Sequence, residues 1–363
     1  MSTLISPTTR LSRIAQARQQ VIEQGASMQL SLIESWIERS WKRCMTWGHT
    51  PSQRLAFEAV SRAQIQHLKE ANQPMLQAAR EELDRLSRAI AGTRYFALLT
   101  DANGIVIDTR GEIDIADPRA NQIARVGVNL SEQHVGTTAI GAVLTEQQPI
   151  WLHRGEHFFH DNTVYSCAGA PLFGPTGECV GMLDLTGVDV PERPELQHLA
   201  AQSARSIETS WIRQMAPSLL LRFNWAGLSM GSDSDGLMGL NADGQVMCAN
   251  RAARAITGLQ LQHDEHVGNV FATPWQSLFD LNPGQRMEVP LWTGLHVQIH
   301  LDSDTRAASM TPRTAPMLKA IETDLIRRAM QQAKGNVAEA ARRLGISRAT
   351  LYRKISPQKS SDQ

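Results

Sequence analysis

Three histidines, one cysteine and one aspartate in the middle of the chain are the residues best suited to chemistry. His153, His157 and His160 stand at positions i, i+4 and i+7, a short distance before Cys167. On a helix, this spacing would bring the three imidazoles to one face, where they could bind a metal ion. Cys167 and Asp184 would then offer sulfur and oxygen as further ligands.

The residues around these histidines favour a loop instead of a helix. Gly155 interrupts the segment, and Trp151-Leu152 before it is strand-like. In a loop, an imidazole followed by two aromatic rings is typical of the wall of a pocket for a small, partly polar organic molecule. We therefore predict an effector site, without a cofactor or a bound metal, at His157, Phe158, Phe159, Cys167 and Asp184. Metal or redox sensing by His157, Cys167 and Asp184 is the alternative, and a core role for the same residues stays open.

One further motif points to catalysis but has the wrong surroundings. Residues 227–231 read Gly-Leu-Ser-Met-Gly, which matches the G-x-S-x-G nucleophile elbow of hydrolases. That elbow needs a strand before the serine and a helix directly after it, whereas residues 232–236 have the composition of a loop. We therefore expect that the protein is not an enzyme.

Near the end of the chain, residues 335–355 have the pattern of a helix-turn-helix. Asn336 and Ser347 can cap two short helices, and Gly345 stands where the first helix must end. Ala341 provides the small contact that lets two helices cross closely. The second helix carries the side chains that we expect to contact DNA, namely Ser347, Arg348, Thr350, Tyr352, Arg353 and Lys354.

The charge distribution supports this assignment. The whole chain has 36 basic and 36 acidic residues. Residues 313–363 hold eleven Lys and Arg against four Asp and Glu, a net charge of +7, so residues 1–312 carry −7. A basic tail on an acidic body is typical of a nucleic-acid-binding module joined to a part with another role.

The four cysteines and the hydropathy pattern indicate a cytoplasmic protein. Cys44, Cys167, Cys179 and Cys248 are scattered, with no CxxC pair, which is typical of reduced thiols. No apolar run approaches the length of a membrane span, and Leu219-Leu220-Leu221 is followed at once by Arg222. We expect no membrane partner.

The elements that must position these residues follow from periodicity. Residues 11–47 predict two helices interrupted near Gly25, with Trp36 and Trp41 buried, and residues 54–91 predict further helix. Strand-like runs and turns then predict hairpins at 95–108 and 167–186, a helix from about 136 to 146, a strand at 149–152, and a helix from about 194 to 215. A hairpin at 236–250 and a strand at 294–300 form a second unit, and residues 303–316, with two prolines, predict a linker.

Several of these segments resemble a known family. The residues 347–354, Ser-Arg-Ala-Thr-Leu-Tyr-Arg-Lys, resemble the Fis-type helix-turn-helix of bacterial enhancer-binding activators. The runs 136–141, 155–159, 166–171 and 181–187, with the leader Ser-Trp-Lys-Arg-Cys at 40–44, are similar to the GAF sensor of acetoin-catabolism and dihydroxyacetone-kinase regulators. Residues 217–302 resemble a PAS domain. The resemblance implies a regulator that senses an alcohol or carbonyl compound.

The chain departs from that family in one respect. Its members carry a central ATPase whose phosphate loop needs G-x-x-x-x-G-K-[ST], and this sequence has no Gly-Lys dipeptide. We therefore expect regulation without ATP hydrolysis, either as a repressor or as an activator that contacts RNA polymerase. An apolar stripe on the helix ahead of the helix-turn-helix predicts a homodimer on a two-fold symmetric DNA site.

These observations predict a multidomain α+β protein. Its parts are a helical leader at residues 1–70, a GAF-like antiparallel sheet with helices at 71–216, and a PAS-like α+β domain at 217–302. The linker at 303–316 then leads to an all-α Fis-type helix-turn-helix tail at 317–363. The expected partners are double-stranded DNA and a small-molecule effector.

Overall fold

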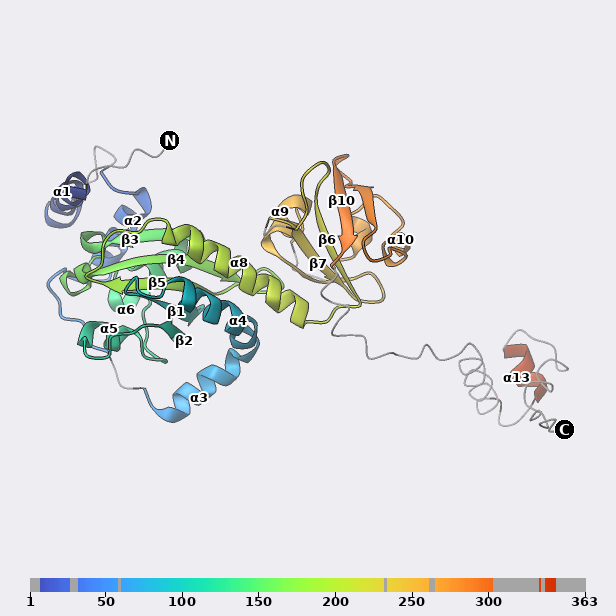
Figure 1. Ribbon diagram of the computed structural model, residues 1–363, viewed down its shortest axis with the longest axis horizontal. Coiled ribbons are helices and arrows are strands. Elements are labelled where there is room, and N and C mark those ends of the chain that lie inside the picture. The colour runs from blue at the N-terminus through green and yellow to red at the C-terminus, as the bar shows by residue number, and fades with distance from the viewer. Residues whose placement is uncertain are drawn as a thin grey trace. The chain divides into compact units, whose positions relative to one another are not determined.

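A computed structural model (Figure 1) describes residues 7–26, 32–57, 60–231, 234–260, 265–302, 333 and 337–343. The chain separates into two compact units, Met1–Ser303 and Asp304–Gln363. The first unit holds two five-stranded sheets, and every pair of neighbouring strands in them is antiparallel. Helices accompany both sheets. The α+β class predicted from the sequence is therefore confirmed.

The first sheet contains the two hairpins predicted at 95–108 and 167–186 and the strand predicted at 149–152. Its strands are β1 (Tyr95–Asp101), β2 (Val106–Gly111), β3 (Ile150–His153), β4 (Tyr165–Phe173) and β5 (Cys179–Val188), in the order β2-β1-β5-β4-β3. Its helices are α4 (Gln73–Ala89), α5 (Pro118–Ile123), α6 (Glu132–Val135), α7 (Ala139–Glu146) and α8 (Leu196–Gln214), with short 3-10 turns η2 (Arg154–Glu156) and η3 (His160–Val164) between β3 and β4. Helix α7 confirms the helix predicted near residues 136–146. It begins after Thr138 because the Thr138 hydroxyl accepts a hydrogen bond from the backbone N–H of Gly141.

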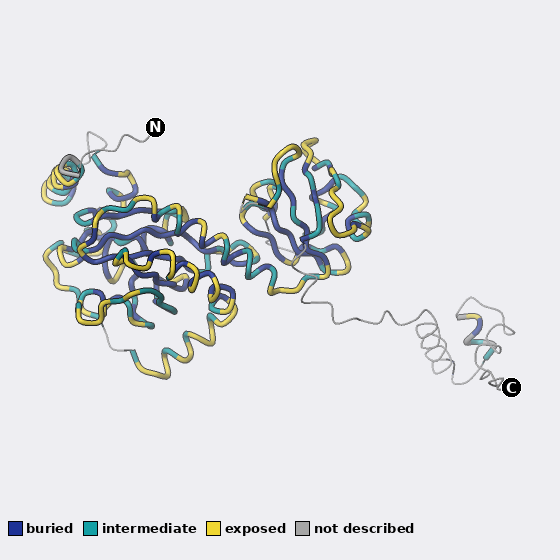
Figure 2. The backbone as a smooth tube through the Cα atoms, viewed as in Figure 1, coloured by how far each residue is buried: buried dark blue, intermediate teal, exposed yellow. Residues whose placement is uncertain are grey.

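Both faces of this sheet are covered. All seven residues of β1 are buried, and their side chains alternate between two cores. Phe96 and Leu98 face one core with α5 and α7, whereas Ala97 and Leu99 face the other core with α4 and α8. Strands β1, β3, β4 and β5 are buried along most of their length, whereas edge strand β2 is only partly buried (Figure 2). A side chain on this sheet therefore contacts solvent only where the covering helices leave space.

The N-terminal helices belong to the first of these two cores. Helix α1 (Pro7–Arg18) continues into a π-helical turn, η1 (Gln19–Glu23), and α2 spans Ser35–Thr46. The predicted break near Gly25 is confirmed, since this glycine has a positive φ of 65°. Ile14 and Trp41 are buried against residues of the sheet and of α7. The leader thus packs as part of the sheet's own hydrophobic core.

The segment predicted as helical from residue 54 to 91 is only partly so. Helix α3 (Arg62–Ala71) begins after Ser61, which forms a capping box with Gln64. Residues 54–57 lie outside any helix, and α4 starts at Gln73. None of the residues in α3 is buried, so this helix is exposed along its length (Figure 2).

The second sheet contains two strands that the periodicity did not indicate. Its strands are β6 (Leu219–Trp225), β7 (Gly236–Leu240), β8 (Val246–Ala249), β9 (Arg286–Pro290) and β10 (His296–Leu301), in the order β8-β7-β6-β10-β9, with helices α9 (Arg251–Thr257) and α10 (Gln276–Phe279) and a 3-10 turn, η4 (Val267–Asn269). The central strand β6 starts with three consecutive leucines, buried on both faces, and so lacks the alternation of a half-exposed strand. The edge strand β9 alternates polar and apolar residues from Arg286 to Val289, but it has only five residues and ends at a proline, so its signal is short.

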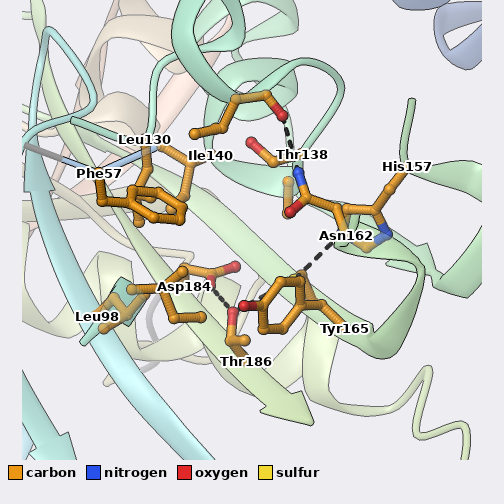
Figure 3. A pocket seen from close by; sticks show the side chains of 14 residues that line it. Phe57, Leu98, Leu130, Thr138, Ile140, His157, Asn162, Tyr165, Asp184 and Thr186 are labelled. Atoms are coloured by element: carbon orange, nitrogen blue, oxygen red, sulfur yellow. Dashed lines mark hydrogen bonds between the residues drawn. The ribbon is translucent and has the colours of Figure 1, made fainter. Parts of the chain in front are cut away.

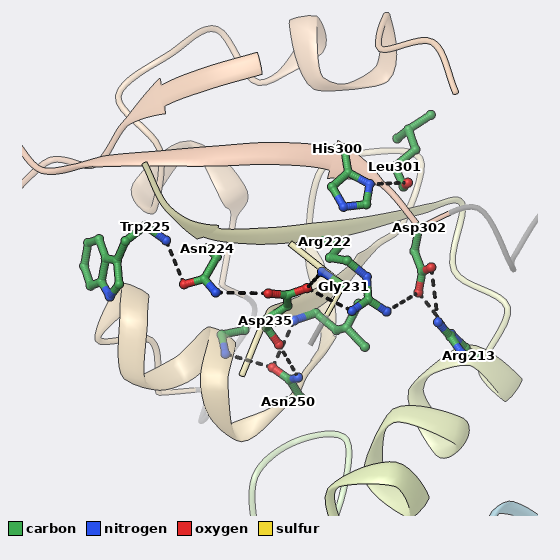
Figure 4. A network of polar contacts seen from close by, with 12 residues as sticks. Arg213, Arg222, Asn224, Trp225, Gly231, Asp235, Asn250, His300, Leu301 and Asp302 are labelled. Carbon is green, nitrogen blue, oxygen red and sulfur yellow. Dashed lines mark hydrogen bonds and ion pairs between the residues drawn. The ribbon is translucent and has the colours of Figure 1, made fainter. Parts of the chain in front are cut away.

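A network of buried ion pairs joins this sheet to α8 (Figure 4). Arg222 on β6 contacts Asp235 at 3.2 Å and Asp302 at 3.4 Å. Arg213, in the last turn of α8, donates two hydrogen bonds to Asp302, at 3.0 and 3.2 Å. Asn224 donates to Asp235 at 3.0 Å. The carboxylates are thus held by charged partners at several points, as buried charges require.

The described part of the second unit comprises Ala333 and helix α13 (Val337–Arg343). Ala341 is 2% exposed. Its role as the small contact between two helices stays a prediction, because the second helix lies outside the described residues. The predicted linker at 303–316 lies outside the described residues. Among the helices that the structure describes, none combines the length and the apolar character of a membrane span.

Candidate functional site

A small cavity lies on the face of the first sheet that α5 and α7 cover (Figure 3). Its volume is about 30 Å³. One water molecule occupies about 10–15 Å³ of such space, so the cavity admits water or a ligand of a few heavy atoms. It is lined by Phe57, Leu98, Ile123, Leu130, Val135, Thr138, Ala139, Ile140, His157, Asn162, Tyr165, Cys167, Asp184 and Thr186.

Asp184 is the most unusual of these residues. It lies on the central strand β5, between Leu98 of β1 and Gly169 of β4, and is fully buried. Its Oδ2 accepts a hydrogen bond from the Thr186 hydroxyl, but its Oδ1 has no hydrogen-bond partner among the described residues. Burial raises the pKa of Asp184 to about 7, although the bond from Thr186 acts in the opposite direction. A buried carboxyl oxygen without a hydrogen-bond partner costs free energy. A ligand that forms this hydrogen bond removes the cost and should bind more tightly.

His157 presents an acceptor to the same cavity. Its Nδ1 lies 2.9 Å from the backbone oxygen of Arg154. Because a carbonyl oxygen only accepts, Nδ1 carries the proton and Nε2 of the neutral ring is left as an acceptor. Burial lowers the pKa of His157 to about 4, so the ring is neutral at physiological pH.

Cys167 lies between these two groups. Its Sγ lies 3.7 Å from Nε2 of His157 and 3.3 Å from the Thr186 hydroxyl oxygen, whose single proton is donated to Asp184. Burial, together with the neighbouring Asp184, raises the pKa of Cys167 well above its ordinary value. The thiol is therefore protonated at neutral pH, and it lacks the thiolate character of a reactive cysteine.

The two phenylalanines of the predicted site lie elsewhere. Phe158 and Phe159 are fully buried and pack edge to face, with their ring centroids 5.2 Å apart. Neither of them lines the cavity. A Cβ atom at Gly136 would come within 2.8 Å of the Phe159 ring, so these rings pack against the start of α7. The structure thus brings His157, Cys167 and Asp184 together and places Phe158 and Phe159 in the core beside them.

The three histidines do not converge, because the segment that holds them is not an α-helix. His153 ends β3, where its Nδ1 contacts the Ser166 hydroxyl at 2.6 Å, and burial together with the Arg10 charge lowers its pKa to about 3. His160 is exposed at the start of η3. Among the described residues, no group of three or more His, Cys, Asp or Glu side chains is placed to hold a metal ion.

Sequence reasoning missed several polar residues of the cavity. Thr186 was detectable, because Asp184 and Thr186 are polar positions on one face of a strand whose other positions are apolar. Asn162 donates to the backbone oxygen of Val135 at 2.8 Å and comes from the turn η3, for which no pattern in the sequence gave a signal. Phe57 also comes from a separate segment of the chain.

The residues expected to contact DNA, Ser347, Arg348, Thr350, Tyr352, Arg353 and Lys354, lie outside the described part of the chain. Their arrangement therefore stays a prediction from the sequence. Helix α13 precedes them in the chain and corresponds to the first helix of the predicted pair.

Curated relatives match more than half of the chain. The acetoin catabolism regulatory protein of Cupriavidus necator is 28% identical over 224 residues, which cover 60% of this chain and 34% of that protein. The propane 2-monooxygenase operon transcriptional activator MimR of Mycolicibacterium goodii is 27% identical over 213 residues, or 56% of this chain and 34% of that protein. The chain thus matches about a third of the length of these relatives.

Among solved structures, the E. coli DhaR(N)-DhaL complex is similar with a TM-score of 0.45 and 13% identity, covering 74% of this chain and 99% of that chain. Residues 317–356 match the family described as bacterial regulatory protein, Fis family. Residues 11–209, more than half of the chain, match the family described as MimR, N-terminal domain. The chain therefore belongs to the family that carries the MimR N-terminal domain, here followed by a Fis-type helix-turn-helix segment.

Proposed function

We propose that this protein is a transcription regulator that binds DNA through residues 317–356 and senses a small neutral alcohol or carbonyl compound in the cavity beside Asp184. The observation that carries the sensing role is the fully buried Asp184 carboxyl, whose Oδ1 lacks a partner among the described residues. The Fis family match supports the DNA-binding role. The names of the relatives, which describe regulators of acetoin catabolism and of a propane monooxygenase operon, agree with this class of effector.

The cavity's size and polarity support a small, uncharged ligand. A volume of about 30 Å³ is far below the roughly 300–1,000 Å³ of sites for drug-sized molecules. With a pKa near 7, Asp184 is partly protonated at neutral pH and can donate to a carbonyl oxygen or accept from a hydroxyl. His157 Nε2 accepts only. A ligand with one hydroxyl and one carbonyl group would satisfy both ends, since its hydroxyl can donate to His157 and its carbonyl oxygen can accept from protonated Asp184.

The domain organisation in this proposal follows the sequence. Residues 71–216 form a GAF-like sensor that the leader at 1–70 completes, and residues 217–302 form a PAS-like domain. The antiparallel sheets with flanking helices support these two assignments. Residues 303–316 link them to the DNA-binding segment.

In this proposal, the effector regulates how much of its DNA site the protein occupies. The protein acts as a homodimer on a two-fold symmetric site, since a Fis-type segment of about fifty residues gains stability and a second recognition helix from dimerisation. It works without ATP hydrolysis and either blocks transcription or contacts RNA polymerase. An effector that binds one dimer geometry better than another shifts the population of the DNA-binding form.

Metal or redox sensing at His157, Cys167 and Asp184 is less well supported. The three residues share a cavity, which is what that function would need. The raised pKa of the Cys167 thiol opposes both metal ligation and oxidation, because each requires thiolate character. Metal analysis of the purified protein with and without Cys167→Ser tests this alternative directly.

The decisive experiment pairs a ligand screen with operator binding. Small hydroxyketones, alcohols, ketones and carboxylic acids are added to the full chain, and thermal shift and calorimetry report binding. Asp184→Leu should weaken binding of the best compound by about tenfold or more, the value of one buried hydrogen bond. The control Asp108→Leu makes the same exchange on edge strand β2 and should bind normally. Equal affinity of both variants would refute the site.

A further inference from the structure

We propose that Arg18, at the end of helix α1, is a positioning residue for the ligand site, because it holds the segment that places His157 in the cavity. The inference rests on the proposed function only in naming the cavity as a ligand site. The contacts that carry it are independent of any ligand, and they join the N-terminal leader to the segment between β3 and β4.

Four consecutive backbone oxygens of this segment accept hydrogen bonds from the leader. The Arg18 guanidinium donates to the oxygens of Gly155 at 2.9 Å, His157 at 2.5 Å and Phe158 at 2.9 Å. The oxygen between them, that of Glu156, accepts from the Trp41 indole nitrogen at 2.8 Å. Backbone oxygens that leave water need such partners, and here side chains from α1 and α2 supply them.

The packing around these bonds fixes the guanidinium. Arg18 is partly buried, and its Cζ lies 5.5 Å from the centre of the Trp41 ring. A Cβ atom at Gly155 would approach a methyl group of Ile14 to 3.0 Å, so α1 lies directly against the segment. Burial lowers the pKa of Arg18, in agreement with a guanidinium that has exchanged water for these carbonyl oxygens.

A second contact fixes the same segment from the opposite end of α1. Arg10 donates two hydrogen bonds to the Glu156 carboxylate, at 2.8 and 2.9 Å. That carboxylate also accepts from the backbone N–H of His153 at 2.7 Å. Arg154 between them has a positive φ of 48°, a conformation that a non-glycine residue keeps only when its surroundings impose it.

The consequence concerns which atom of His157 faces the cavity. The ring is oriented by the bond from its Nδ1 to the Arg154 oxygen, and both residues lie in the held segment. Without Arg18, three backbone oxygens lose their donors and the segment must move toward water or other partners. The Nδ1–H form of the ring then loses its fixed partner, and Nε2 no longer meets the ligand as a defined acceptor.

The test follows His157 itself in the full chain. Histidines are labelled with 15N, and the His157 ring signals are assigned by their loss in His157→Gln. In the wild type we expect the Nδ1–H tautomer and a pKa near 4. Arg18→Met, which keeps much of the side-chain length but removes the donors, should give mixed tautomers and about tenfold weaker ligand binding. The matched control Arg39→Met removes a 52% exposed arginine of α2 that pairs with Glu146 and should change neither.

Arg18→Lys separates charge from geometry, because it keeps the positive charge but not the planar group that reaches three oxygens. It also serves if Arg18→Met does not fold, and we expect mixed tautomers here too. A folded Arg18 variant with the wild-type tautomer would overturn the proposal, whatever the ligand result. A shifted tautomer in a protein that binds none of the screened compounds would support the positioning role and count against the sensing function alone.

Discussion

Replacing Asp184 with asparagine tests the buried carboxyl most directly. Burial raises the pKa of this group from its ordinary value of 3.8 to about 7, against the smaller effect of the Thr186 hydroxyl. Each pH unit between the folded and unfolded pKa is worth about 1.4 kcal/mol. A rise of roughly three pH units therefore corresponds to about 4 kcal/mol of lost stability once the group is ionised. Local relaxation or water entry would reduce this figure.

The sign of the pH dependence follows from proton binding. Between about pH 4 and pH 7 the folded protein keeps a proton on Asp184 that the unfolded chain has released. The free energy of unfolding therefore falls as the pH rises through this window, and it levels off above the folded pKa. Asparagine is neutral throughout, so Asp184→Asn should lack this contribution and gain stability relative to the wild type toward pH 8.

Urea unfolding of the full chain at several pH values between 5 and 8.5 measures the effect, with circular dichroism and tryptophan fluorescence as probes. Burial also raises the pKa of Glu208 to about 7, but that contribution is common to wild type and variant and cancels in their difference. Asp108→Asn, on edge strand β2, is the matched control and should follow the wild type. If the wild type and Asp184→Asn kept a constant stability difference across this range, the assignment of a raised pKa to Asp184 would be wrong.

Three further predictions concern other parts of the chain. Arg348→Ala should weaken operator binding by about 1–3 kcal/mol and relax sequence preference at one base pair, as gel-shift titrations would reveal, and unchanged preference would contradict its placement. Glu132→Gln breaks a buried pair with Arg43 at 2.8 Å and should lower the free energy of unfolding by about 2 kcal/mol, against less than about 0.5 kcal/mol for Glu38→Gln in an exposed helical pair. Asp302→Asn should reduce the ratio of operator affinities with and without effector while leaving effector affinity unchanged, and an unchanged ratio would exclude its role in coupling.

Much of the first sheet could be predicted because its signals are local. The Asn-Gly turn at residues 103–104 fixed the β1–β2 hairpin, and Thr138 marked the start of α7. Strand β6 escaped detection because a central strand buried on both faces loses its alternation. A strand buried on both faces is therefore hard to recognise, because the sequence does not show directly which residues are buried.

The cavity was harder to predict than the sheet. Asp184 and Cys167 stood out as polar or reactive residues in strands, and both line it. Phe158 and Phe159 were predicted because they follow His157 in sequence, yet neighbours in an extended or turning segment point in different directions. Phe57 and Asn162 reach the cavity from segments that only the tertiary fold brings near β5. The sequence shows which polar residues lie in apolar strands, but it does not show which residues from other segments lie beside them in the fold.

The sheet that bears the cavity also connects it to the rest of the chain. Strand β4 places Cys167 against the cavity and the next residue, Ala168, against the core that contains α8. Because protein interiors are densely packed, a ligand that displaces β4 must also displace the helix on its other face. The last turn of that helix carries Arg213, which is bonded to Asp302. Asp302 directly follows strand β10, so under the proposed function we expect this ion pair to couple the effector site to the part of the chain that binds DNA.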